Sequence, residues 1–288
     1  MADPRPLLAV DGPSLIYRAF FALPDSITDG EGRPVNGLLG ATNLILQAVE
    51  RHDPRAVVLC WGAEAATYRV ELLPAYHADR PPVPDALAPQ LEWAGAFWGA
   101  FGWHSLVHDT LEADDLLGSL AAVEVEAGGR ALLFTGDRDM FQCVSDRVAV
   151  LWPGGGKGGP EVIDVEGVRR RYGIDPALVP DFIALRGDPS DSIPGGKGIG
   201  EKTARDLLLE YGSLEGAIAN AVRERPRVQA ALRGQAGELR AYKRIATLVH
   251  VPVERPPDRE TDWAGAAAAA RERGMNRLAE RLEAKLAA

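Results

Sequence analysis

The 288-residue sequence contains few cysteines, no long hydrophobic run and fewer basic than acidic residues. Cys60 and Cys143 lie in apolar surroundings without the spacing of a zinc site, which excludes a disulfide scaffold and suits a reducing compartment. No stretch reaches the roughly 18 apolar residues that a membrane span requires. The first residues do not show a basic segment followed by an apolar one, so we expect no signal peptide, no membrane partner and a cytoplasmic protein.

The excess of acidic residues initially argues against nucleic acid, because proteins that bind it usually present a basic surface. The sequence has 32 Lys and Arg against 41 Asp and Glu, a net charge of −9. Eight of those acids belong to the motifs described below, and without them 32 basic residues face 33 acidic ones. Residues 192–250 alone carry 10 basic and 6 acidic side chains. The charge therefore predicts one acidic centre beside a moderately basic surface.

Short apolar segments alternate with segments of helical periodicity through the first part of the chain. This order predicts an α/β fold with a mostly parallel sheet flanked by helices. The strands that we expect are Leu7–Val10, Ala56–Trp61, Trp103–His108, Ala131–Thr135 and Val148–Trp152. Strand signals fade after Val165, so we expect one domain over residues 1–180 and a helical module over 181–288. The last 25 residues, 264–288, predict a single Ala-rich amphipathic helix.

Two segments lack periodicity. Residues 74–89 hold five prolines, which predicts a long irregular excursion of the kind that is usually functional. The glycine-rich run 154–159 predicts a hairpin loop.

Acidic side chains follow the predicted strands or open predicted helices. The carboxyl ends of parallel strands line the ligand crevice of an open α/β sheet, so these acids could converge there. The eight acids are Asp11, Glu112, Asp114, Asp115, Asp137, Asp139, Asp188 and Asp191. Magnesium and manganese prefer such oxygen ligands, and two ions about 4 Å apart can support phosphodiester cleavage. The alternative is that individual acids only cap helices or shape turns.

A glycine- and lysine-rich motif over residues 193–204 precedes a predicted helix. Gly198 and Gly200 allow close backbone approach, and free N–H groups at a helix start attract phosphate. Lys197 and Lys202 add positive charge. A phosphate-binding Walker A loop is excluded because Glu201 stands where that loop requires glycine. A simple tight turn followed by a helix remains the alternative.

Together these motifs resemble the 5′ nuclease family that includes bacterial flap endonucleases and the N-terminal nuclease domain of DNA polymerase I. The resemblance runs from about Leu7 to Val251. It rests on Val10-Asp11-Gly12, Tyr17-Arg18-x-Phe20, Gly32-Arg33-Pro34-Val35-Asn36, Glu112-Ala113-Asp114-Asp115, Thr135-Gly136-Asp137-Arg138-Asp139, Gly187-Asp188-Pro189-Ser190-Asp191 and a helix-hairpin-helix at Pro194 to Ala204. No polymerase segment follows, so we expect a stand-alone member.

The resemblance implies a PIN-like fold that cleaves 5′ flaps and 5′ ends of DNA in replication and repair, with two or three Mg²⁺ or Mn²⁺ ions held by the eight acids. It implies an arch over about residues 70–95, through which a 5′ strand passes, and a potassium ion at the helix-hairpin-helix. Residues implied to position the 5′ strand are Tyr76, His77 and Arg80. Residues implied to contact DNA are Arg18, Asn36, Lys197, Gly198, Gly200, Lys202 and Thr203. We also expect a monomer with a functional link to DNA polymerase and ligase.

Two positions depart from the family pattern. Gly62 stands where the family has an aspartate after the second strand, and His77 replaces a lysine. We expect Gly62 to weaken the binding of one metal ion, with Glu64 either reaching back as a substitute or remaining a solvated loop residue. A DNA-junction-binding protein with little catalysis and a ribonuclease are the alternatives to a DNA nuclease.

Overall fold

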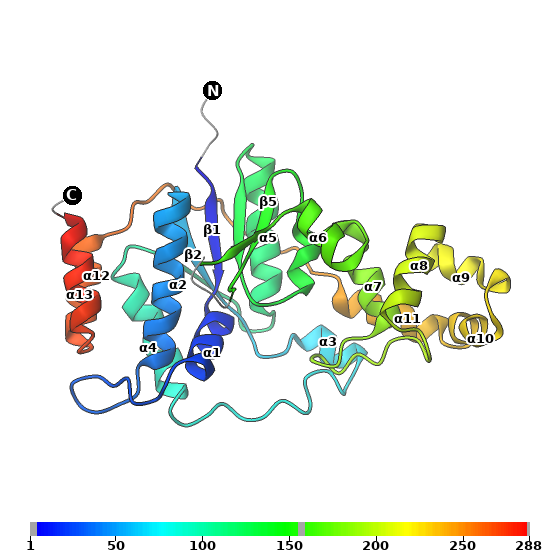
Figure 1. The fold of residues 1–288 in the computed structure, drawn as a ribbon, viewed down its shortest axis with the longest axis horizontal. Coiled ribbons are helices and arrows are strands. Elements are labelled where there is room, and N and C mark those ends of the chain that lie inside the picture. The colour runs from blue at the N-terminus through cyan, green and yellow to red at the C-terminus, as the bar shows by residue number, and fades with distance from the viewer. Residues whose placement is uncertain (1–4, 155–158, 287–288) are drawn as a thin grey trace.

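The computed structural model describes residues 5–154 and 159–286. Within them lies a six-stranded sheet in the order β3-β2-β1-β4-β5-β6, parallel except for β6 (Figure 1). The strands are β1 (Leu7–Asp11), β2 (Ala56–Trp61), β3 (His104–Val107), β4 (Ala131–Phe134), β5 (Val148–Trp152) and β6 (Glu161–Ile163). The predicted α/β class is therefore confirmed, and β6 is an addition that the sequence did not indicate.

Alternating side chains of β1 pack into two separate apolar cores, as a strand buried on both faces requires. Leu8 and Val10 face the first core, and Leu7 and Ala9 face the second. The helices of the first core are α1 (Gly12–Ala22), α2 (Asn36–His52), α4 (Ala88–Gly99), α12 (Trp263–Glu272) and α13 (Asn276–Glu283). The helices of the second core are α5 (Ala113–Glu126), α6 (Val165–Tyr172), α7 (Val179–Arg186), α8 (Glu201–Tyr211), α9 (Leu214–Ala219), α10 (Pro226–Gly234) and α11 (Ala236–Ala246).

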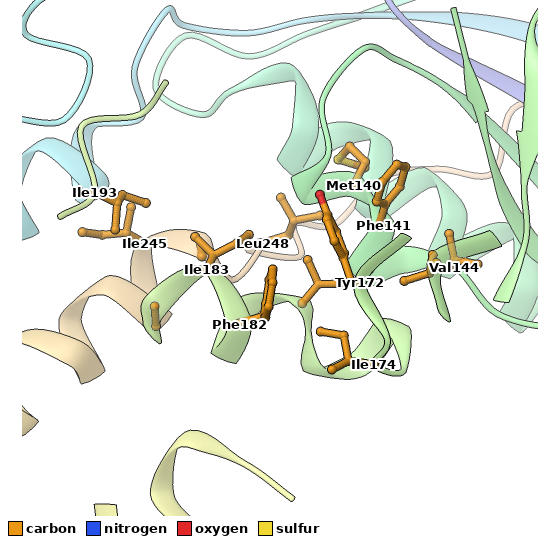
Figure 2. Close-up of a cluster of buried hydrophobic side chains, with 14 of the residues drawn as sticks. Met140, Phe141, Val144, Tyr172, Ile174, Phe182, Ile183, Ile193, Ile245 and Leu248 are labelled. Atoms are coloured by element: carbon orange, nitrogen blue, oxygen red, sulfur yellow. The ribbon is translucent and has the colours of Figure 1, made fainter. Parts of the chain in front are cut away.

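The second core is continuous from the sheet into the helical module. Figure 2 shows Met140 and Phe141, next to the sheet, in one cluster with Tyr172, Phe182 and Ile245. In Figure 1, α8 to α11 extend from this side to one end of the molecule. The domain boundary near residue 180 stays a prediction, because one apolar core spans it.

The C-terminal segment differs from the single helix predicted over residues 264–288. Gly274, with φ +67°, separates α12 from α13 and lets the chain reverse. A Cβ atom at this position would lie 2.6 Å from the backbone nitrogen of Gly30, so only glycine fits the contact. Residues 155–158 of the predicted glycine-rich hairpin lie outside the described residues.

The irregular excursion is confirmed between α3 (Thr67–Leu72) and α4, where residues 73–87 form turns without a helix or strand. We call these residues the arch segment. Across the part of the chain that the structure describes, no helix has the length and apolar character needed to cross a bilayer.

After α11 the chain returns along the amino ends of the strands, in a segment of residues 250–262 that we call the strap. Arg55, just before β2, donates to the carbonyl of Pro256 at 2.7 Å and pairs with Asp258. The same guanidinium pairs with Glu124, whose side chain is fully buried. Arg255 of the strap binds Glu124 from the other side. These ion pairs fasten the strap to α5 and β2.

We expect Arg55→Met to lower the free energy of unfolding by about 3 kcal/mol or more, because it leaves the buried carboxylate of Glu124 short of a partner. Arg255→Met removes a cation whose side chain is 40% exposed and should cost less than about 1 kcal/mol. Denaturant unfolding of the two variants measures the difference. Equal losses would show that Arg55 has no special role.

Candidate active site

A cavity of about 540 Å³ opens at the carboxyl ends of β1, β2 and β4. β1 lies between β2 and β4, at the point where the strand order of the sheet changes direction. Ligands bind at this point in open α/β sheets. The start of α5, the loop after β4 and the arch segment complete its walls. Six of the eight predicted acids line it: Asp11, Glu112, Asp114, Asp137, Asp139 and Asp191.

Four of these acids, which we call the acidic quartet, form no ion pair with any basic side chain of the described residues. They are Asp11, Asp114, Asp137 and Asp139. Asp11 accepts hydrogen bonds from the Ser14 amide at 3.0 Å and the Thr135 hydroxyl at 2.8 Å, and Asp137 accepts one from the Asp139 amide at 2.7 Å. These bonds hold the carboxylates in place, but they do not neutralise them.

Burial and mutual repulsion raise the pKa of every member of the quartet. Burial is the largest cause for Asp114 and Asp139, followed in both by the charge of Asp137, and their pKa values lie well above the usual range. Burial also raises the pKa of Asp11, and burial with the charge of Asp191 raises that of Asp137 to about 7. Four crowded carboxylates of this kind are unfavourable unless cations neutralise them.

The other four acids have cationic partners within the protein. Arg69 is buried and places Nη1 2.8 Å from Glu112 Oε1 and Nη2 2.9 Å from Asp115 Oδ1. Arg186 lies 3.0 Å from Asp188, and Arg80 lies 3.4 Å from Asp191. Burial alone would lower the pKa of Arg69, but the charges of Glu112 and Asp115 outweigh it and raise that pKa. The eight acids thus divide into a neutralised and an unneutralised half.

Asp115 and Asp188 are the two predicted acids that do not line the cavity. Asp115 is fully buried outside the cavity, and its two oxygens accept from Arg69 and from the Val249 amide at 2.8 Å. Asp188 binds Arg186 and the hydroxyl of Ser190. Their oxygens are engaged by protein donors in this structure, and their role as metal ligands stays a prediction.

Tyr76 and His77 are largely buried but line the cavity, and their contact with the 5′ strand stays a prediction. The Tyr76 hydroxyl donates to Glu112 Oε2 at 3.1 Å, and its ring stacks on His77 with centroids 3.8 Å apart. His77 Nδ1 donates to the Glu64 carbonyl at 2.9 Å, and Nε2 lies 3.0 Å from Asp191 Oδ1. Both residues therefore position acids.

Arg80 is the one of the three predicted arch residues whose side chain remains accessible, at 40% exposure. Its guanidinium lies 3.4 Å from Asp191 and lines the cavity. A planar guanidinium at this place can bind a phosphate by two parallel hydrogen bonds.

Gly62 has no room for the aspartate that the family pattern places there. A Cβ atom would lie 2.4 Å from the backbone of Glu112 and Ala113. The chain is held this close because the Ala63 amide donates to the Leu111 carbonyl at 2.8 Å. Glu64 is exposed and lines the cavity, and its role as a substitute ligand stays a prediction.

Six of the seven predicted DNA contacts lie at least partly on the surface, and Asn36 does not. Arg18, Lys197, Gly198, Gly200 and Lys202 are exposed, and Thr203 is half-buried. Asn36 is 1% exposed, and its amide donates to the Phe20 and Leu23 carbonyls at 3.0 Å, so it joins α1 to α2.

Arg227, whose guanidinium lies against Gly198, was not predicted from the sequence. Its Nε would be 2.1 Å from a Cβ atom there. The two positions are 29 residues apart, so only the fold brings this cation to the glycine motif.

The quartet fits hard divalent cations by the chemistry of its donors, which are all carboxylate oxygens. Among the described side chains, no three His, Cys, Asp or Glu residues form a ready-made cage for a metal ion. Magnesium does not need one, since it usually keeps several waters and binds one or two carboxylates. These carboxylates would hold hydrated divalent ions, which would supply the positive charge that the quartet lacks.

The chain matches two family models. The model described as "5′-3′ exonuclease, N-terminal resolvase-like domain" covers residues 6–173, and "5′-3′ exonuclease, C-terminal SAM fold" covers residues 174–263. Among sequence relatives, a Streptomyces coelicolor 5′-3′ exonuclease is 37% identical over 88% of this chain and 89% of its own length. DNA polymerase I of Mycobacterium bovis is also 37% identical over 88% of this chain, which spans 28% of that protein.

Solved structures share the fold. The bacteriophage T5 5′-exonuclease with bound zinc has a TM-score of 0.70 at 16% identity, covering 96% of this chain and 98% of that one. The catalytic core of Rad2 in complex with DNA substrate has a TM-score of 0.62 at 14% identity, covering 98% of this chain and 92% of that one. These matches confirm the resemblance and the fold expected from the motifs.

We expect Asp114→Asn to raise the melting temperature of the metal-free protein by a few degrees at pH 7.5. A raised pKa means that the ionised carboxylate destabilises the folded state above its unfolded pKa, and asparagine removes that penalty. The same change should reduce the rise in melting temperature caused by Mn²⁺.

Calorimetry with and without Mn²⁺ measures both effects, and Asp146→Asn, at an exposed acid away from the cavity, is the matched control. An unchanged response to Mn²⁺ in Asp114→Asn would remove this residue from the metal site.

Gly62→Asp should not restore a metal ligand. We expect it to destabilise the protein by about 1–3 kcal/mol, with Gly62→Ala causing most of the same loss, because Cβ itself meets the backbone. Thermal unfolding and a manganese titration measure this, and stronger metal binding by Gly62→Asp would contradict it.

Proposed function

This chain belongs to the 5′-3′ exonuclease family, and on that premise we propose that it is a divalent-metal-dependent 5′ nuclease that cleaves 5′ flaps and 5′ ends of DNA. The acidic quartet is the observation that carries the proposal. Four carboxylates without a protein cation at a cavity repel one another, and a phosphodiester brought beside them would be repelled. Divalent ions remove both difficulties.

The quartet would hold two Mg²⁺ or Mn²⁺ ions, with Asp191 at its border. Ions bound there supply an activated water and stabilise the leaving oxygen of a phosphodiester. Arg69 fixes Glu112, and His77 fixes Asp191, so the carboxylates keep their places when the strand enters. Arg80 binds a phosphate of that strand from the arch segment, and the burial of the cavity wall limits access of bulk water.

The helix-hairpin-helix region would hold the duplex. Lys197, Lys202 and Arg227 surround the exposed backbone at Gly198 and Gly200, where N–H groups at the start of α8 favour a phosphate. A potassium ion bound by backbone carbonyls of the same turn belongs to this proposal.

The place of action follows from the same proposal. The enzyme would act as a cytoplasmic monomer on flaps, nicks and 5′ ends during replication and repair, in steps shared with a DNA polymerase and a ligase. Its similarity to the nuclease part of DNA polymerase I supports this placement. A protein that only binds junctions is less consistent with the quartet, which would weaken DNA binding without metal.

Cleavage of a 5′-flap DNA tests the proposal. With Mg²⁺ or Mn²⁺ we expect the wild-type protein to cut near the flap base, and Asp139→Asn to be at least about a hundredfold slower, because a metal carboxylate contributes several kcal/mol at the transition state. Arg147→Ala, at the opposite ends of the strands, is the matched control and should cleave normally. Flap binding without any cleavage by the wild type would contradict the nuclease and support a junction-binding protein.

A further inference from the structure

The surface of the arch segment and of its two flanking helices is acidic. Residues 62–92 carry five acidic side chains that are exposed and that form no ion pair within the described part of the chain. We call them the arch acids: Glu64, Glu71, Asp79, Asp85 and Glu92. Figure 1 shows the arch segment crossing from α3 to α4 on the side where the strands have their carboxyl ends. The arch acids therefore lie on the same side of the sheet as the active-site cavity, and Glu64 also lines that cavity.

Positive charge is scarce in the same region. Over residues 62–92, all of which the structure describes, Arg80 is the one exposed basic side chain. Arg69 and His77 are buried in their contacts with site acids. The neighbouring lining residues Pro81 and Val83 have apolar side chains, which donate no hydrogen bond to a phosphate. The arch thus offers one phosphate-binding side chain among five unpaired acids.

The arch segment holds its acids in place. Buried Tyr76 and His77 anchor its first half to Glu112 and Asp191. Three prolines restrict the backbone torsions over residues 81–84, between Asp79 and Asp85. A strand that passes the arch segment therefore meets these carboxylates where the structure has them.

The arch acids differ from the acidic quartet in what can neutralise them. The quartet is buried and crowded, so bound divalent ions remove its charge. The arch acids are exposed and lie six to eight residues apart in the sequence. Within the described residues they form no group of three that could hold an ion. Only dissolved salt screens them, so their repulsion of a polyanion persists after the active site has taken up its metal.

The length of a 5′ single strand decides how much of this repulsion it meets. A strand of one or two nucleotides reaches the cavity and places a phosphate at Arg80. A longer strand continues along the arch segment, which forms one wall of the cavity, and brings one further negative charge per nucleotide beside the arch acids. The added phosphates gain no cationic partner there, so each one makes binding less favourable.

We propose that the arch acids make this chain selective for short 5′ ends, so that nicks and flaps of one or two nucleotides are cleaved in preference to long single-stranded flaps. Asp79 and Asp85, which lie in the arch segment itself, are the specificity-determining residues of this proposal. The inference rests on the proposed nuclease function and names the class of 5′ end that the site takes.

Cleavage of two DNAs that differ only in the length of the 5′ flap tests the proposal in the presence of Mn²⁺. One flap has a single nucleotide, and the other is long. At about 0.01 M salt we expect kcat/KM of the wild type to be about tenfold higher for the short flap, because the carboxylates are poorly screened. At about 0.1 M salt the screening length falls from about 30 to about 10 Å, and the preference should shrink to about threefold. Salt weakens the duplex contacts of both DNAs equally, so the ratio isolates the arch.

The double variant Asp79→Asn/Asp85→Asn should show the smaller preference, about threefold, already at about 0.01 M salt, with cleavage of the short flap unchanged. The matched control is Glu126→Gln/Asp146→Asn, which removes two exposed charges near the amino ends of β4 and β5 and should keep the wild-type ratio.

Equal cleavage of both flaps by the wild type at low salt would overturn the proposal. An unchanged ratio in the arch variant, or the same change in the control, would overturn it as well. In each of these cases the short flap is still cut, so the proposed nuclease function stands. If the wild type cuts neither flap, the proposed function fails, and this inference fails with it.

Discussion

Repulsion between carboxylates is the constraint on which the active site depends. Eight acids meet near the ends of β1 and β4, and the fold places cations beside only four of them. Arg69 alone neutralises two of these acids, Glu112 and Asp115. Because Arg69 is buried, its interaction with these two carboxylates must compensate for its lost hydration. The remaining quartet is not neutralised by the protein, which makes the centre of the site a place for positive charge from outside the protein.

The neutralised acids also give the site its rigidity. Glu112 accepts from Arg69, Tyr76 and the Ala66 amide, so one carboxylate joins α3, the arch segment and α5. His77 makes a similar connection between the arch segment and Asp191. The arch segment is irregular in backbone, but its buried side chains fasten it to the acids, and the exposed guanidinium of Arg80 faces the cavity.

Much of this arrangement could be predicted from the sequence, because strand ends and helix starts are local signals. Apolar segments located Asp11 and Asp137, and the rule that parallel strands end at one edge brought them together. The pairing of Asp115 with Arg69 could not be predicted, since it joins residues 46 positions apart and depends on the packing of α3 on α5. For the same reason, the spacing that located Gly62 could not predict the close contact with the backbone of Glu112 and Ala113. The burial of Asn36 between α1 and α2 could not be predicted either.

The strap has a consequence for the order in which this chain can be completed during synthesis. Arg55 leaves the ribosome 203 residues before its partner Asp258, and Arg5 leaves it 255 residues before Glu260. The sheet can form its parallel pairs earlier, but its amino edge is closed only by the last segment of the chain. The Arg55–Glu124 pair of the nascent chain therefore stays partly solvated until the strap has been synthesised. A chain that terminates near residue 250 would contain the acidic site but would lack the strap that covers the amino ends of the strands.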